Sequence, residues 1–379
     1  MILKDALVVE IASVLAGPSV GMFLAELGAE VIKIEHPLNG GDVTRSWRVS
    51  GEAAAGGRSS YFNAINWGKR TEALNAKDGG DRSRLLELIR RADIVLVSFK
   101  PGDAEKLGLS WEVLRAENPR LIYAAITGYG EGDPRTAYDA LLQAETGFMH
   151  LNREPGGSPM KMPVALIDVL AAHHLKQLVL IAWIQRMQTG EGTKVEVSLF
   201  EAAVSSLVNQ AGAWLYAGAE PQPLGSEHPQ IYPYGGSFTT ACGRAIVPAV
   251  GNDAQFRSLC TLLGAPELPD SPDYATNPAR SANRDGLRIK LQELFAAVPE
   301  AEEFLQELHQ ARVPAAMIRS ISEALGDYRN GAEFALHESK DGAMTGLPQL
   351  TGRISGARVS RNLSEPPCYP FAGRPSEKS

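Results

Sequence analysis

The sequence predicts an α/β protein built on a doubly wound parallel sheet. Two observations carry this prediction. Over the first 130 residues, short runs typical of buried strands alternate with helical patterns, and the links between them are short. Such alternation is typical of parallel strands joined by helices that cover both faces of the sheet. The chain has 379 residues, so we also expect a second, smaller α+β domain.

The amino-terminal third supplies most of the expected strands. The stretch ALVVEI at 6–11 is typical of a buried strand. A helix follows it, with Pro18 in its first turn and Gly28 just past its end. The next strands are expected at 30–35, 69–75, 93–99 and 120–130, separated by an amphipathic helix over 78–93 and a short helix that ends before Pro119.

The rest of the chain is richer in helices and contains the expected domain boundary. Helical patterns at 138–151, 169–187 and 199–217 flank one alternating strand within 189–199. A stretch rich in proline and glycine, 219–237, then breaks the order. We therefore expect 1–218 to form the first part of a large domain, 219–237 a linker with a glycine loop, 238–320 the small domain, and 321–379 the return to the large domain with a C-terminal tail.

Composition and charge exclude several classes of function. The net charge is −7 without a basic run, which argues against a nucleic-acid partner but allows a local basic pocket for a phosphorylated small molecule. Cys242, Cys260 and Cys368 show no metal or redox spacing, as expected of free thiols in a reducing cytoplasm. No signal-peptide pattern begins the sequence, and the apolar stretch 175–184 is too short to span a bilayer. We expect a soluble cytoplasmic protein without a membrane partner.

Two common kinds of site are disfavoured by their missing patterns. The first strand–helix turn, IASVLAGPSVG at 11–21, lacks the G-x-G-x-x-G that lets a dinucleotide approach the helix, so no NAD is expected. The carboxyl ends of the strands can still form a ligand crevice. His173 and His174 have no partner at metal-ligand spacing, so we expect no metal and assign both to helix packing.

Asp168 interrupts the apolar run MPVALIDVLAAHH, at the point where a helical pattern begins. Local sequence favours a helix cap that accepts from the N–H of residue 170 or 171, because aspartate is a preferred cap. A carboxylate at a helix N-terminus lies in positive potential, so we expect it to stay ionised. An ionised carboxylate in an apolar crevice is also a competent nucleophile toward an activated acyl group, and the two roles are compatible.

Six stretches of the chain form a specific pattern through their order and spacing: residues 8–45, 66–75, 92–130, 137–149, 185–202 and 250–264. This pattern resembles the class III CoA-transferases, the CaiB/BaiF type that includes formyl-CoA and carnitine CoA-transferases. The resemblance covers roughly 1–350. It implies a Rossmann-like large domain built from both ends of the chain, an inserted small domain, and an interlocked homodimer.

The resemblance also implies a mechanism. The position of the family's catalytic aspartate is Asp168 in this sequence. Asp168 would attack an acyl-CoA donor to form a mixed anhydride, and the CoA thiolate would then convert it to an aspartyl-CoA thioester. A small carboxylic acid acceptor would reverse these steps and leave as the new acyl-CoA. Coenzyme A is then part of the substrate, and the exchange needs neither ATP nor a metal.

Further roles follow from the resemblance, residue by residue. Tyr138 and Asp139 match a tyrosine–acid pair beside the reacting groups, and Gly235 and Gly236 fall where some relatives have a loop that closes over the intermediate. The positions that match CoA-binding stretches are Val14, Leu15, Ala16, His36, Arg45, Ile65, Lys69, Arg70, Ser98, Phe99, Lys100 and Lys106. Lys69 and Arg70 suit the nucleotide phosphates.

Departures from the family pattern leave alternatives open. His36 stands where many relatives have a basic residue that binds the CoA nucleotide, and Ala172 stands at a usual glycine. The related α-methylacyl-CoA racemases use a histidine where this chain has Tyr138, and tyrosine is a poor base at neutral pH. A racemase is therefore the second hypothesis. A non-catalytic CoA-binding or assembly protein is the outside alternative, and a Rossmann oxidoreductase is the third hypothesis.

Overall fold

The computed structural model describes residues 2–52, 55–330, 336–340, 344–359 and 362–368. The chain divides into two compact units, which are described separately. Unit 1 comprises 1–146, 163–208 and 334–379, and unit 2 comprises 147–162 and 209–333. This division differs from the sequence-based boundaries in three ways: 147–162 joins the second unit, that unit begins before the proline- and glycine-rich stretch, and it extends to 333 instead of 320.

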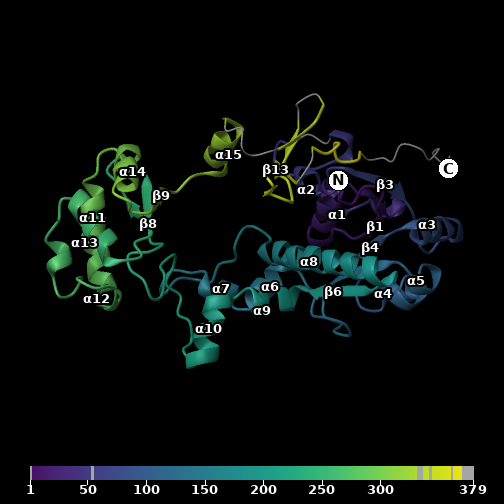
Figure 1. Ribbon diagram of the computed structural model, residues 1–379, viewed down its shortest axis with the longest axis horizontal. Helices are drawn as coiled ribbons and strands as arrows, with labels where there is room; N and C mark the ends of the chain where they lie inside the picture. The colour runs from purple at the N-terminus through teal and green to yellow at the C-terminus, as the bar shows by residue number, and fades with distance from the viewer. Residues whose placement is uncertain (1, 53–54, 331–335, 341–343, 360–361, 369–379) are drawn as a thin grey trace. The chain divides into compact units, whose positions relative to one another are not determined.

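A parallel six-stranded sheet forms the centre of unit 1, as the sequence predicts (Figure 1). Its order is β3-β2-β1-β4-β5-β6, with Val8 of β1 opposite Val31 of β2 and Ile94 of β4. The chain moves outward from β1 in both directions, so a crevice forms at the carboxyl ends of β1 and β4. The strands are β1 (Leu7–Ile11), β2 (Glu30–Glu35), β3 (Lys69–Ala73), β4 (Ile94–Val97), β5 (Ile122–Thr127) and β6 (Lys194–Ser198).

Helices cover both faces of this sheet, so the predicted doubly wound α/β class is confirmed. On one face, Val9 and Val95 pack against the apolar sides of α3 (Gly79–Arg91) and α5 (Trp111–Glu117). On the other face lie α1 (Ala16–Glu26), all of whose residues are buried, and α8 (Leu166–Thr189). The shorter helices of unit 1 are α2 (Ser60–Ala64), α4 (Asp103–Leu107), α6 (Asp139–Glu145) and α9 (Leu199–Ser205), with 3₁₀ turns η1 (Pro37–Asn39), η2 (Val43–Ser46) and η3 (Ala55–Gly57).

The long helix α8 is the main support of the site. By length and composition alone it could cross a membrane, the one such helix in the described part of the chain. It runs beside β6 and against α1 (Figure 1). Its buried positions Ile167, Ala171, Leu175, Val179 and Ala182 recur at helical spacing.

The C-terminal part of the chain, from 334, belongs to unit 1. Glu26 at the end of α1 is buried, and its carboxylate accepts from the backbone N–H groups of Gln349 and Leu350 at 2.7 and 2.8 Å. It also lies 2.9 Å from the imidazole Nε2 of His337. Short antiparallel pairs complete this region: β10 (His337–Glu338) with β11 (Thr345–Gly346), and β12 (Arg353–Ile354) with β13 (Ala357–Arg358).

Unit 2 has its own sheet and core. Three antiparallel strands in the order β7-β8-β9 pack with helices around Phe238, Phe256 and Phe295. The elements are α7 (Phe148–Leu151), α10 (Val208–Ala217), β7 (Phe238–Thr239), β8 (Ala245–Pro248), α11 (Asp253–Leu262), η4 (Leu268–Asp270), α12 (Asn277–Ala282), α13 (Arg284–Ala296), α14 (Ala301–Gln310), β9 (Ala315–Met317) and α15 (Ile321–Asn330). Two predicted helices are each split in two: 138–151 breaks at Gly147, and 199–217 breaks near Leu207, before Val208.

Candidate active site at the carboxyl edge of the sheet

A pocket of about 240 Å³ opens at the carboxyl ends of the parallel strands. Four of the stretches that line it are the turn after β1, the segment after β4, the start of α6 and the start of α8. Residues given a role in the sequence analysis that line it are Val14, Leu15, Ala16, Ser98, Phe99, Lys100, Tyr138, Asp139 and Asp168. Their convergence follows from the topology, because parallel strands bring their carboxyl ends to one edge.

Asp168 lies within the first turn of α8 and does not cap it. The N-cap position is Ala165, which has no capping side chain, so the cap interpretation is wrong. Within the described part of the chain, no hydrogen bond or ion pair holds the Asp168 carboxylate. Burial, and then the negative charge of Asp139, raise its pKa to about 7. The expectation of a fully ionised carboxylate is therefore also wrong: near pH 7, protonated and ionised forms coexist.

Asp139 performs the capping that Asp168 does not. One of its carboxylate oxygens, Oδ1, accepts a hydrogen bond of 2.8 Å from the backbone N–H of Ile167, in the first turn of α8. The other, Oδ2, accepts at 2.8 Å from the side-chain amide of Gln143, one turn later on α6. Asp139 thus satisfies an otherwise free N–H at the start of α8. Tyr138 precedes it as the N-cap of α6, with an exposed ring.

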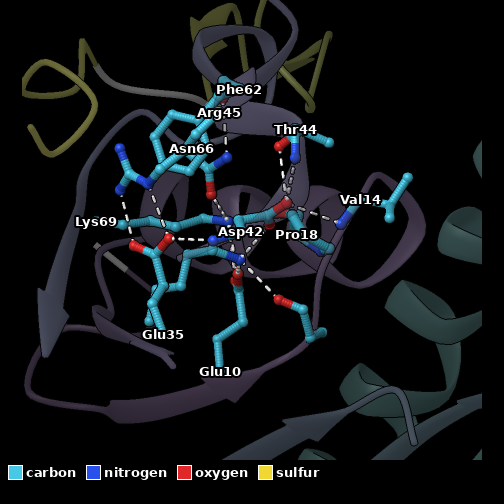
Figure 2. A network of polar contacts seen from close by, with 12 residues as sticks. Glu10, Val14, Pro18, Glu35, Asp42, Thr44, Arg45, Phe62, Asn66 and Lys69 are labelled. Atoms are coloured by element: carbon cyan, nitrogen blue, oxygen red, sulfur yellow. Dashed lines mark hydrogen bonds and ion pairs between the residues drawn. The ribbon is translucent and has the colours of Figure 1, made fainter. Parts of the chain in front are cut away.

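The turn after β1 is held in a strained conformation by buried charges (Figure 2). Val14 has φ of +72°, a rare value for a β-branched residue, and its N–H donates to Asp42 Oδ1 at 3.4 Å. Lys33 Nζ donates to the carbonyl of Ala12 at 2.6 Å and pairs with Asp42 and Glu10, each at 2.9 Å. Strain of this kind persists only where its surroundings fix it, and here it lines the pocket.

Lys69 occupies the same network, and a direct contact with a CoA phosphate does not fit this arrangement (Figure 2). Its ammonium is fully buried, 2.8 Å from Glu10 Oε2, and donates at 2.8 Å to the carbonyl of Pro18 and to Asn66 Oδ1. Three partners use all three of its N–H groups. Burial lowers the pKa of Lys69 to about 8, against the opposing effect of Glu10.

Arg45 and Arg70 also have protein partners. Arg45 forms a bidentate pair with Glu35, at 2.8 and 2.7 Å, and lies 3.7 Å above the ring of Phe62. It borders a second hollow of about 490 Å³ together with Arg48, which the sequence analysis did not single out. Arg70 is exposed near the amino end of β3, paired with Glu30 at 2.6 Å. It therefore lies at the sheet edge opposite the pocket.

The remaining expected CoA contacts lie outside the main pocket. Ile65 is buried at the end of α2. His36 follows β2, where its Nδ1 accepts from the N–H of Leu38 at 3.2 Å. Lys106 is exposed on α4 and lies 3.2 Å from Asp103. Among the basic residues that the resemblance assigns to CoA, Lys100 alone lines the main pocket in the described structure.

Two residues near the carboxylates of Asp168 and Asp139 were missed in the sequence. Arg135 lines the pocket, stacks 3.6 Å from the ring of Tyr129 and pairs with Asp133 at 2.8 Å. Its position three residues before Tyr138 was a usable signal. Burial and the charges of Asp168 and Asp139 raise the pKa of Tyr61 to about 12, so its hydroxyl stays protonated. No local pattern points to Tyr61, because tertiary folding brings α2 toward α6 and α8.

Gly235 and Gly236 belong to unit 2. Gly235 has φ of +87°, and a Cβ there would overlap the carbonyl oxygen of Ser226. The position therefore requires glycine. The predicted role of this pair in covering a reaction intermediate stays a prediction.

Comparison with known proteins bears on this site. The model of CoA-transferase family III matches residues 3–370. The succinate–glutarate CoA-transferase of Agrobacterium fabrum is 38% identical over 329 residues, which cover 84% of this chain and 80% of that protein. The acetyl-CoA:oxalate CoA-transferase of Acetobacter aceti is 34% identical, covering 92% and 88%. A CAIB/BAIF family protein from Brucella suis superposes with a TM-score of 0.84 at 36% identity, covering 96% of this chain and 95% of that one.

Proposed function

Because this chain belongs to CoA-transferase family III and is a CoA-transferase, we propose that it moves CoA between two carboxylic acids with Asp168 as nucleophile. One observation carries the proposal. A carboxylate with no hydrogen-bond partner in the described chain lines a pocket at the carboxyl edge of the sheet, with a pKa raised to about 7. A carboxylate of higher basicity is a stronger nucleophile than an ordinary aspartate, provided that it is ionised.

The first half of the exchange takes the acyl group from the donor. An oxygen of Asp168 attacks the thioester carbonyl carbon, the carbon–sulfur bond breaks, and the CoA thiolate leaves an acyl-aspartyl anhydride. The thiolate then attacks the Asp168 carbonyl carbon of that anhydride. The donor acid departs as its carboxylate, and an aspartyl-CoA thioester remains.

The second half is the reverse with a new acid. The acceptor carboxylate attacks the aspartyl thioester, expels the CoA thiolate and forms the second anhydride. The thiolate attacks the acceptor's acyl carbon, which releases the new acyl-CoA and the free Asp168 carboxylate. Of the backbone N–H groups at the start of α8, those of Leu166, Ile167 and Val169 already donate to protein oxygens. The N–H of Asp168 itself is the one suited to stabilise the oxyanions.

The acceptor in this proposal is a small dicarboxylic acid. The similar proteins are named for succinate, glutarate, oxalate and mesaconate, all of which carry two carboxylates. A pocket of about 240 Å³ suits acids of that size together with the end of the CoA arm. Lys100 and Arg135 supply positive charge along the same wall.

We also propose that the protein works as a dimer of identical chains. The helix α10 exposes large apolar side chains at Trp214, Leu215 and Tyr216, and α8 exposes Ile181, Ile184 and Met187. Exposed apolar surface on this scale commonly marks an interface. The expected interlocked arrangement rests on the resemblance.

The direct test is to trap the covalent intermediate. The protein is mixed with a panel of acyl-CoA thioesters, treated with hydroxylamine or borohydride, digested with trypsin, and the peptide 162–176 is weighed. A donor-dependent mass change on Asp168 supports the proposal, with Asp168→Asn as the control that must stay unmodified. An unmodified peptide together with exchange of the α-proton into deuterated water would indicate a racemase. If neither the adduct nor the proton exchange is observed, the remaining hypothesis is a non-catalytic CoA-binding protein.

A further inference from the structure

Gln143 is buried beside the nucleophile, although nothing in the proposed chemistry uses it. Its side chain is 1% exposed, on the face of α6 that packs against α8. The side-chain amide Nε2 lies 2.8 Å from Asp139 Oδ2 and 3.4 Å from the carbonyl oxygen of Val164. Both partners can only accept hydrogen bonds from a neutral amide, so the NH₂ group must face them.

Two hydrogen-bonded links connect this amide to the backbone around Asp168. Asp139, held by Gln143, accepts from the N–H of Ile167, the residue directly before the nucleophile. The contact with Val164 restrains the backbone four residues before Asp168. The carboxylate of Asp168 has no partner of its own in the described structure, so its position depends on how the start of α8 is held.

We propose that Gln143 is a positioning residue: its amide holds the Asp139 carboxylate against the first turn of α8, and this contact sets the place of Asp168. The inference rests on the proposed function, because it needs Asp168 to be the attacking group. Gln143 is not among the residues that line the pocket, so it acts through Asp139. A hydrogen-bonded pair four residues apart on one helix is thereby connected to the nucleophile on another.

The test exchanges the amide donor and the carboxylate acceptor between positions 143 and 139. In Gln143→Glu, two carboxylates face each other and the contact is lost. In the double variant Asp139→Asn with Gln143→Glu, the new amide at position 139 can donate to the new carboxylate at position 143, while its carbonyl still accepts from Ile167. We expect Gln143→Glu to lower kcat roughly 10- to 100-fold with little change in KM for acyl-CoA, as a misplaced reacting group does. The double variant should be faster than Asp139→Asn alone.

The controls separate positioning from general damage. Gln177→Glu makes the same chemical change on the exposed side of α8 and should retain parental kcat. Thermal unfolding shows whether each variant is folded, and if Gln143→Glu is not, the comparison of the double variant with Asp139→Asn decides alone. A double variant no faster than Asp139→Asn overturns the proposal, as does a folded Gln143→Glu variant with parental kcat.

A separate measurement distinguishes failure of the underlying function. If Asp168→Asn keeps parental transferase activity, Asp168 is not the nucleophile and both proposals fall together. If Asp168→Asn is inactive while Gln143→Glu forms the Asp168 adduct at the parental rate, only the positioning role falls. If the Asp168 adduct forms slowly in Gln143→Glu and its rate is restored in the double variant, both the nucleophilic role of Asp168 and the positioning role of Gln143 are supported.

Discussion

Asp168 and Asp139 bring two carboxylates together in a partly buried site. The repulsion between them raises the pKa of Asp168 and so affects the proposed reaction. Desolvation and the Asp139 charge both disfavour ionisation of Asp168, which raises its pKa to about 7 from the ordinary 3.8. The same effects make the ionised form a better nucleophile. The site thus balances the fraction of Asp168 that is ionised against the reactivity of that fraction.

Activity should follow this titration. In the proposed mechanism the ionised form of Asp168 attacks, so kcat/KM should rise about tenfold per pH unit below pH 7 and level off above it. In Asp139→Asn the neighbouring charge is gone, the pKa of Asp168 falls, and the acid limb should shift to lower pH. A pH profile of both proteins measures the shift. The groups facing Asp168 that must be considered are Asp139 and Tyr61. An unshifted limb would argue against electrostatic coupling.

Stability should show the opposite dependence. A carboxyl whose pKa is raised on folding stabilises the protein fully below pH 3.8, and this contribution is lost as pH rises toward 7. Asp168→Asn removes the titration. Its melting temperature should therefore exceed the parent's by more at pH 8 than at pH 5. Equal differences at both pH values, measured by thermal unfolding, would show that the pKa is not raised.

Lys100 and Arg70 provide a matched pair for CoA binding. Lys100 lines the pocket, whereas Arg70 is exposed near the amino end of β3. Lys100→Ala should raise KM for acyl-CoA roughly tenfold with kcat nearly unchanged, as expected for one lost contact to an anionic group. Arg70→Ala should keep the parental KM. The reverse result would place the CoA phosphates at the other edge of the sheet.

At the scale of elements, buried charges join β1, β2, β3 and the turn before α1. Glu10, Lys33, Asp42 and Lys69 are buried and neutralise one another. The close approach of α1 to this network needs a glycine, because a Cβ at Gly21 would overlap the carboxylate of Glu10. The network therefore fixes both the start of α1 and the strained turn at Val14.

Removing one charge from this network should be costly. Lys33→Met leaves Glu10 and Asp42 with one fewer cation in a buried site, and we expect a loss of about 3–5 kcal/mol in the free energy of unfolding. The exposed pair of Lys106 and Asp103 offers the control. Lys106→Met should change the free energy of unfolding by no more than about 0.5 kcal/mol. Denaturant unfolding measures both. Similar losses for the two variants would contradict the role of the buried network.

For the whole molecule, the exposed apolar residues of α10 are the feature to explain. Leu215 is 80% and Tyr216 96% exposed, values unusual for large apolar side chains. A second chain covering this helix accounts for them without any change in either unit.

Association should respond to a single charge. Leu215→Lys should raise the dimer dissociation constant roughly tenfold or more, because a charge would be buried in an apolar contact. Sedimentation or light scattering over a concentration series gives the constant, and the exposed Lys290→Ala on α13 is a suitable control. A parent that stays monomeric at all concentrations would contradict the dimer.

The sequence by itself determined the parallel sheet, its six strands and the family. Strand and helix patterns such as 6–11 and 78–93 are local properties of the sequence, so they predicted the strands and helices of the sheet directly. The resemblance supplied the candidate positions 14–16, 98–100 and 138–139, and the parallel topology explains why they meet at one edge of the sheet. Asp168 was found through the resemblance, and its role as nucleophile remains a proposal.

Only the tertiary structure decided what the polar side chains do. From the sequence, Lys69 was expected to bind a CoA phosphate and Arg45 to contact CoA, but both pair with carboxylates on other strands. Asp168 suited a helix cap, yet Asp139 from another helix provides it. Hydrogen-bond partners and burial depend on residues distant in sequence, and a local pattern does not contain them. The pKa of Asp168 likewise depends on tertiary structure, because burial and the nearby Asp139 raise it.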